Sequence, residues 1–202
     1  KGVSVRDLCA AANANVAAIQ YHFGGKEGLY HAIFSNTLDE DEARFKVSME
    51  NITALVDSAV GDRTQLAVAL DLYINSFFAR YPFEEHKRWF SVLVMRELSF
   101  PRQGFDLVFE RRVKPSQQVL AKIIAALNGV NANDESVKLQ AHALNSTIMS
   151  VVVSRNILTR VMDWKNFTPQ NLEQLSQVIR ELMFNALALT PPQVTTLSGD
   201  VK

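Results

Sequence analysis

Apolar residues recur every three or four positions through most of the chain, whereas strict alternation of apolar and polar residues is nearly absent. The first spacing places side chains on one face of an α-helix, and the second is typical of a half-buried strand. Glycine and proline are scarce and fall mainly between the periodic segments. The pattern therefore predicts an all-α chain.

Two short helices joined by a tight turn are predicted near the start of the chain. Ser4 can cap a helix over about 5–12, and Asn15 can cap a second helix over about 16–22. The second helix ends before the flexible pair of glycines at 24–25. Two short helices with this spacing form a helix-turn-helix candidate.

Longer helices are predicted downstream, separated by glycine, proline and asparagine. Pro115 lies inside one of them and should kink or divide it, because proline has no backbone N–H to donate. The acidic run Asp39–Glu42 is interpreted as a solvated helix face. The predicted helices run from Lys26 to the break at Gly61, from about Leu66 to Pro82, and over about 84–98, 105–127, 134–162 and 168–189.

Composition limits the classes of function. The 21 basic residues balance the 21 acidic ones, so any DNA binding must come from a local patch rather than from a global positive field. Cys9, the single cysteine, cannot form an internal disulfide, and no apolar run approaches the ~20 residues that a membrane span needs. We therefore expect a soluble protein of the reducing cytoplasm with no membrane partner.

Catalytic and metal-binding patterns are weak. The sequence has no nucleophile elbow and no paired-carboxylate motif, and residues 24–27 lack the upstream glycine and the Ser or Thr of a phosphate loop. The four histidines, His22, His31, His86 and His142, are scattered without the spacing of a metal site. We expect no enzymatic activity, no metal and no cofactor.

The helix-turn-helix candidate resembles a known family. Residues 4–8, Ser-Val-Arg-Asp-Leu, and residues 19–29, Ile-Gln-Tyr-His-Phe-Gly-Gly-Lys-Glu-Gly-Leu, are similar to the DNA-binding domain of TetR/AcrR regulators. Asn13 departs from the glycine usual at the turn, but asparagine tolerates the left-handed conformation. The first helix of the family's domain would lie before Lys1. A weaker resemblance to the CecR-like subgroup comes from Arg96-Glu97, Pro101, Phe105 and Arg112 to Pro115.

The resemblance implies a helix-turn-helix domain over 1–38, an effector-binding and dimerising domain over 39–190 and a tail over 191–202. It also implies a regulator that occupies a palindromic operator in double-stranded DNA as a homodimer. A small-molecule effector would release this repressor from the operator. The alternative is a helical small-molecule carrier or binding module that does not recognise DNA.

The resemblance also assigns contacts position by position. Arg6 and Gln20 are expected to reach base edges, because arginine can pair with guanine and glutamine with adenine. The other contacts are expected with phosphates and with the groove walls. The phosphate set is Ser4, Asn15, Tyr21, His22 and Lys26, and the groove is lined by Val16, Ala17 and Ala18, with Val5 completing the DNA-binding set.

An aromatic and thioether-rich middle predicts a ligand site, with ordinary core as the alternative. A mostly apolar small molecule would bind there, held by one inward polar group. The predicted apolar contacts are Trp89, Leu93, Phe105, Phe109 and Met149, with Arg96 or His142 as the polar anchor.

Apolar stripes on the last two helices predict a two-fold dimer. Two helices from each chain could bury these stripes together, although both stripes could instead face the core of their own chain. The predicted interface residues are Leu144, Ile148, Val151, Val152, Leu172, Leu175, Ile179, Leu182, Met183 and Ala186.

Overall fold

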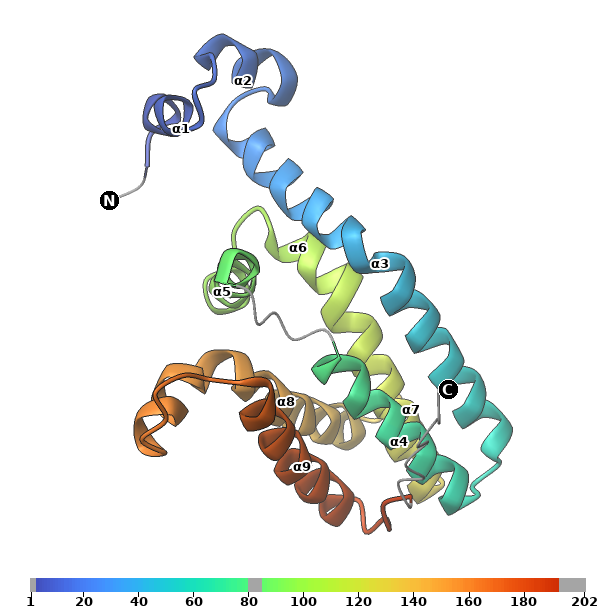
Figure 1. The fold of residues 1–202 in the computed structure, drawn as a ribbon. Coiled ribbons are helices and arrows are strands. Elements are labelled where there is room, and N and C mark those ends of the chain that lie inside the picture. The colour runs from blue at the N-terminus through green and yellow to red at the C-terminus, as the bar shows by residue number, and fades with distance from the viewer. Residues whose placement is uncertain (1–2, 80–84, 193–202) are drawn as a thin grey trace, which may run out of the picture. The chain divides into compact units, whose positions relative to one another are not determined.

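The computed structural model describes residues 3–79 and 85–192, apart from the side chains of residues 85–88 and 152–153. All regular elements in these ranges are helical, so the predicted all-α class is confirmed (Figure 1). The predicted stop at Pro82 lies outside the described residues. The helices are α1 (Val5–Ala12), α2 (Val16–Phe23), α3 (Lys26–Ala59), α4 (Arg63–Phe78), α5 (Glu85–Ser99), α6 (Phe105–Val108), the π-helix η1 (Phe109–Val113), α7 (Lys114–Asn128), α8 (Glu135–Val161) and α9 (Pro169–Ala186).

The chain divides into two compact units. Unit 1 comprises residues 1–45 and 84–115, and unit 2 comprises residues 46–83 and 116–202. The first half of α3 therefore belongs with α5, α6 and η1, whereas its second half belongs to unit 2. This division differs from the domain boundary expected at residue 38, because residues 39–45 interact with η1.

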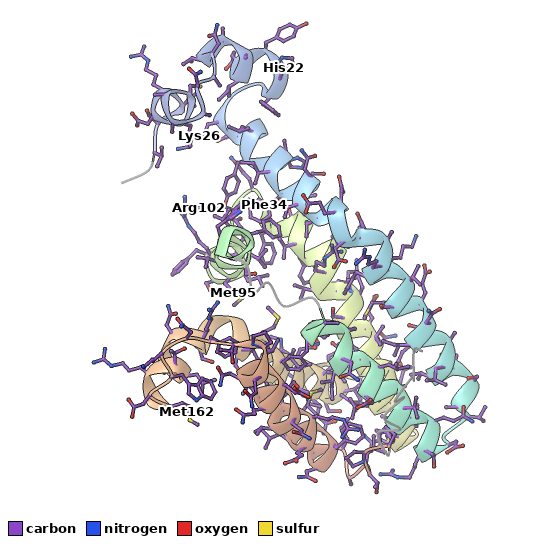
Figure 2. The ribbon with its side chains drawn as sticks, in the orientation of Figure 1. His22, Lys26, Phe34, Met95, Arg102 and Met162 are labelled. Atoms are coloured by element: carbon purple, nitrogen blue, oxygen red, sulfur yellow. The ribbon has the colours of Figure 1, made fainter. Side chains whose placement is uncertain are left out.

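Unit 1 is built around Phe34, Leu38 and Val108, which are buried. Phe34 lies on α3, and its ring packs against that of Phe90 on α5, with the ring centroids 5.3 Å apart. Figure 2 labels Phe34 beside the loop that follows α5. A Cβ atom on Gly104 in this loop would lie 3.0 Å from the Phe34 ring, so the glycine permits a close approach of the loop to α3.

A buried carboxylate holds the same loop. Glu97 on α5 is 0% exposed, and its Oε2 accepts the backbone N–H groups of Arg102 and Gly104, both at 3.1 Å. Its Oε1 accepts the hydroxyl of Tyr30 on α3 at 2.7 Å. Burial and this hydrogen bond raise the pKa of Tyr30 to about 12. Glu97 thus ties α5, the loop and α3 together.

The π-helical turn η1 also docks on α3. Arg111 forms ion pairs with Asp39 and Glu42, and Arg112 donates to the carbonyl of Leu38 at 2.7 Å. The Arg112 guanidinium also lies 4.7 Å from the centroid of the Phe45 ring. The acidic run over 39–42 is therefore only partly a solvated face, because two of its carboxylates bind Arg111.

Pro115 divides the helix as predicted, but the change in geometry comes before it. The amide of Lys114 donates to the carbonyl of Phe109, five residues earlier, which is the π-helical register. Pro115 has no amide to donate to the carbonyl of Arg111. That carbonyl instead accepts a hydrogen bond from the side chain of Arg112 at 3.4 Å.

Unit 2 is a helical bundle in which α9 packs against both α4 and α8. Its buried side chains include Tyr73 of α4, Ile124 of α7 and Phe184 of α9. The end of α9 is capped by Arg63, which donates to the carbonyl of Ala188 at 2.6 Å. In the described part of the chain, no helix combines the length and apolarity required to cross a membrane.

Candidate nucleic-acid interface

Helix α1 begins with a reciprocal cap. The Ser4 hydroxyl accepts the amide of Asp7 at 3.2 Å and donates its proton to the Asp7 carboxylate at 2.7 Å. The carboxylate also accepts the amide of Ser4 at 3.1 Å. These hydrogen bonds lower the pKa of Asp7, because they stabilise the charged carboxylate. The cap predicted from Ser4 is confirmed.

The turn between α1 and α2 has the predicted backbone geometry. Asn13 is left-handed, with φ 50° and ψ 40°, and this residue tolerates that conformation better than most. The next residue, Ala14, donates its amide to the carbonyl of Cys9 at 2.9 Å. Cys9 itself is buried, as expected of a small apolar residue in a helix-helix contact. Asn15 then caps α2 by accepting the amide of Ala17 at 2.8 Å.

Helix α2 has one buried side and one open side. Ile19 is buried, whereas Val16, Ala17 and Gln20 are exposed and Tyr21 is 86% exposed. The sequence of α2 contains no Asp or Glu, so no carboxylate on this helix would repel a phosphate. Its open side combines small residues with an amide and a phenol, which suits close approach to the edges of bases.

The junction between α2 and α3 is set by glycines. Gly24 ends α2 in the left-handed region, with φ 68°, and donates its amide to the carbonyl of Gln20. A Cβ atom on Gly28 would lie 1.7 Å from the carbonyl oxygen of Phe23. Gly28 was not among the residues predicted to matter, although its place in the family-like segment was a signal that could have found it.

Lys26 has a structural partner that was not predicted. At the start of α3, labelled in Figure 2, its ammonium group donates to the backbone carbonyl of Val3, which precedes α1. The ammonium has three N–H donors, so two remain for a phosphate. Lys26 therefore links α3 to the chain before α1 as well as offering a positive charge.

The structure leaves most of the predicted DNA-contacting side chains accessible. Arg6 makes no hydrogen bond or ion pair within the described part of the chain. The hydroxyl proton of Ser4 is already engaged by Asp7, so Ser4 can act on a phosphate only as a minor contact. The exposed members of the predicted set are Ser4, Arg6, Asn15, Val16, Ala17, Gln20, Tyr21, His22 and Lys26, and the half-buried members are Val5 and Ala18.

The residues predicted to bind a ligand fall in both units. In unit 1, the rings of Phe105 and Phe109 are stacked with centroids 5.7 Å apart, and Leu93 packs against the core around Phe34. The two predicted polar anchors are exposed on their helices. The unit 1 members are Trp89, Leu93, Arg96, Phe105 and Phe109, and the unit 2 members are His142 and Met149.

Much of the predicted dimer surface is buried within the single chain. Ile179 is only 3% exposed, so it already packs inside its own protomer, whereas Leu182 on α9 is 55% exposed. The side chain of Val152 lies outside the described residues. The buried members are Ile148, Val151, Leu172, Ile179 and Met183, the half-buried members are Leu144 and Leu175, and the exposed members are Leu182 and Ala186.

Two family models match the chain. The model of bacterial regulatory proteins of the tetR family matches residues 1–33, which cover α1, α2 and the start of α3. The model of the C-terminal domain of the HTH-type transcriptional dual regulator CecR matches residues 66–189. A Shigella flexneri protein named HTH-type transcriptional dual regulator CecR is 27% identical over 176 residues, which are 87% of this chain and 78% of that protein.

Proposed function

Because the chain belongs to the CecR-like branch of the TetR family of bacterial regulatory proteins, we propose that it binds a two-fold symmetric operator as a dimer and leaves it when a small molecule binds. Regulation of transcription by a DNA-binding helix-turn-helix protein follows from the family. Repression, the dimer and the response to an effector are our proposals. The relative is named a dual regulator, so reporter experiments should detect both lowered and raised transcription.

The open side of α2 is the observation that carries this proposal. It presents Gln20 and Tyr21 beside two small residues, Val16 and Ala17, on a helix without acidic side chains. In a helix-turn-helix the second helix lies in the major groove while the first crosses the backbone. Helix α2 would therefore enter the groove, and Arg6 on α1 would reach DNA beside it.

Base reading is tested with Arg6→Ala on randomised operator variants. If Arg6 contacts a base, the variant should lose ~1–3 kcal/mol of binding free energy and relax the preference at one operator position. Lys138→Ala, which removes an exposed positive charge on α8, is the matched control and should bind normally. A uniform loss on all sequences would make Arg6 a phosphate contact.

Phosphate binding is tested with Lys26→Gln. The variant should weaken binding to every sequence to a similar extent and lower the salt slope of log Kd by about one for each phosphate that the side chain no longer neutralises. Its hydrogen bond to Val3 requires a check that α1 remains folded, which circular dichroism supplies. An unchanged salt slope would remove Lys26 from the interface.

The proposed dimer surface lies on the exposed sides of α8 and α9. Val178 and Leu182 on α9 are exposed apolar residues four positions apart, which places them on one face of the helix. Leu139, Ile157 and Val161 are exposed on α8, with Leu139 and Ile157 separated by five helical turns and hence on one face. Exposed apolar faces on two helices are typical of a surface that another subunit covers.

Two substitutions on α9 separate association from folding. Leu182→Asp should give folded monomers with weakened operator binding, because it places a charge on an exposed face. Ile179→Asp should instead destabilise the protomer, because Ile179 is buried within it. Sedimentation and circular dichroism measure the two effects. A folded wild type that stays monomeric at micromolar concentration would contradict the dimer.

The response to an effector requires a ligand that prefers one conformation. A tenfold loss of operator affinity corresponds to ~1.4 kcal/mol of coupling free energy, and operator DNA must weaken effector binding by the same factor. Titration of an effector with and without operator measures this factor. Equal affinities in the two titrations would exclude allosteric release.

A further inference from the structure

Helix α8 carries a half-buried arginine, Arg155, in which one buried nitrogen has no hydrogen-bond partner. Within the described part of the chain, two buried side-chain atoms have no hydrogen-bond partner, Nδ2 of Asn145 and Nη1 of Arg155. Both lie on α8, in unit 2. Burying a polar group without a partner is unfavourable, and burying part of a charged group is more so.

Asn145 is the weaker candidate of the two. Its amide is neutral, and its Oδ1 is paired with the hydroxyl of the buried Tyr73. The same hydroxyl lies 3.1 Å from the carbonyl of Ser116, which links α4, α7 and α8. The amide therefore has a structural role in unit 2, whereas Arg155 lacks a polar side-chain partner.

One aromatic ring faces the guanidinium of Arg155, and a second ring packs against the first. The guanidinium lies 5.1 Å from the centroid of the Phe167 ring, which is 6% exposed. The ring of Trp164 meets that of Phe167 edge-on, with centroids 6.1 Å apart. A guanidinium that lies over a ring is stabilised through its own flat face. The N–H groups at the edge of the guanidinium still need hydrogen-bond acceptors.

No acidic side chain in the described ranges forms an ion pair with Arg155. Ile148 and Val151, at helical spacing from it on the same side of α8, are buried. An acceptor supplied from outside the chain would thus meet a half-buried guanidinium beside the Phe167 ring, with one nitrogen still unpaired. A planar carboxylate matches the edge of a guanidinium with two parallel hydrogen bonds.

We propose that Arg155 binds the carboxylate of a small organic anion whose apolar part lies against Phe167 and Trp164. This proposal rests on the proposed function, because it assigns the charge and chemical class of the effector. Arg155 takes the role of polar anchor that was predicted for Arg96 or His142, both of which are exposed. A cationic effector is excluded at this position by repulsion from the guanidinium.

The probes are octanoate and benzoate, with octanol and benzamide as uncharged analogues and inorganic phosphate as an anion without an apolar part. Calorimetric titration of the full-length protein without DNA should show binding of a carboxylate at least tenfold tighter than that of its uncharged analogue. Arg155→Met should abolish this difference. Arg160→Met, which removes an exposed positive charge from the same helix, should preserve it.

Stability in the absence of probe gives an independent readout. Arg155→Met should unfold at the same temperature as the wild type or higher, because the unpaired N–H group is removed and methionine can pack on Phe167. A clearly lower unfolding temperature of Arg155→Met would show that the guanidinium is already paired, and would overturn the proposal. So would equal binding of carboxylates and uncharged analogues, or binding of phosphate as tightly as octanoate. DNA is absent throughout, so these failures are distinct from a failure of operator binding.

Discussion

Replacing Glu97 should loosen the loop that follows α5 from α3. Glu97→Ala removes the acceptor of two backbone amides, those of Arg102 and Gly104, and of the Tyr30 hydroxyl. A buried donor left without a partner costs ~1–3 kcal/mol. Since the amide of Gly104 is buried and the other two donors are partly buried, we expect a total loss of about 3–5 kcal/mol.

Urea unfolding gives the free-energy difference, and amide hydrogen exchange locates it. The amides of Arg102 and Gly104 should be protected in the wild type and exchange much faster in Glu97→Ala. Glu97→Gln keeps an acceptor without the charge and should lose less stability. Glu40→Ala removes an exposed carboxylate from α3 and should stay within ~0.5 kcal/mol of the wild type. The reasoning is refuted if Glu97→Ala unfolds within ~1 kcal/mol of the wild type or leaves both amides protected.

Three further substitutions test local features of the fold. The pKa of Tyr30 is raised from 10.0 to about 12, so its contribution to stability is complete below pH 10 and is lost as the pH rises to 12. Tyr30→Phe should reduce this loss when the free energy of unfolding is measured against pH in the alkaline range. Parallel curves for the variant and the wild type would contradict this role of Tyr30. Gly28→Ala should unfold at a lower urea concentration and abolish operator binding, because its Cβ would overlap the carbonyl of Phe23. Normal DNA binding by this variant would show that the junction between α2 and α3 can shift freely. Val60 is β-branched, 92% exposed and held in the left-handed conformation with φ 46°. Because asparagine tolerates this conformation better, Val60→Asn should stabilise the protein by ~0.5–1 kcal/mol. An unchanged temperature of thermal unfolding would argue against backbone strain at this residue.

Local signals in the sequence predicted the helix caps and the turn between α1 and α2 well. Ser4, Asn13 and Asn15 act through their own side chains or backbone on residues only two to four positions away, so the sequence alone contains the necessary information. Thr168 is a further example, because its capping bonds with Asn171 start α9 where predicted. The family resemblance of the same region was confirmed by the match of the tetR family model to residues 1–33.

Contacts between distant segments were not predictable in the same way. Pro115 predicted a break in the helix. The π-helical turn before it also contains Arg111, whose partners Asp39 and Glu42 lie 72 and 69 residues away along the chain. An apolar stripe also does not reveal whether it faces its own core or a partner, which is why Ile179 was assigned to the interface. The burial of Glu97 and the unpaired state of Arg155 likewise depend on packing that periodicity does not encode.

The central claim is that this protein recognises specific DNA through α2. The most direct test is to sequence the genomic fragments retained by the full-length wild type and by Gln20→Ala under identical salt. The account predicts a small set of wild-type sites that share an inverted repeat, with enrichment lost or altered at a defined base in Gln20→Ala. Retention of fragments without any shared sequence, equally by both proteins, would contradict it and favour a helical small-molecule binding module instead.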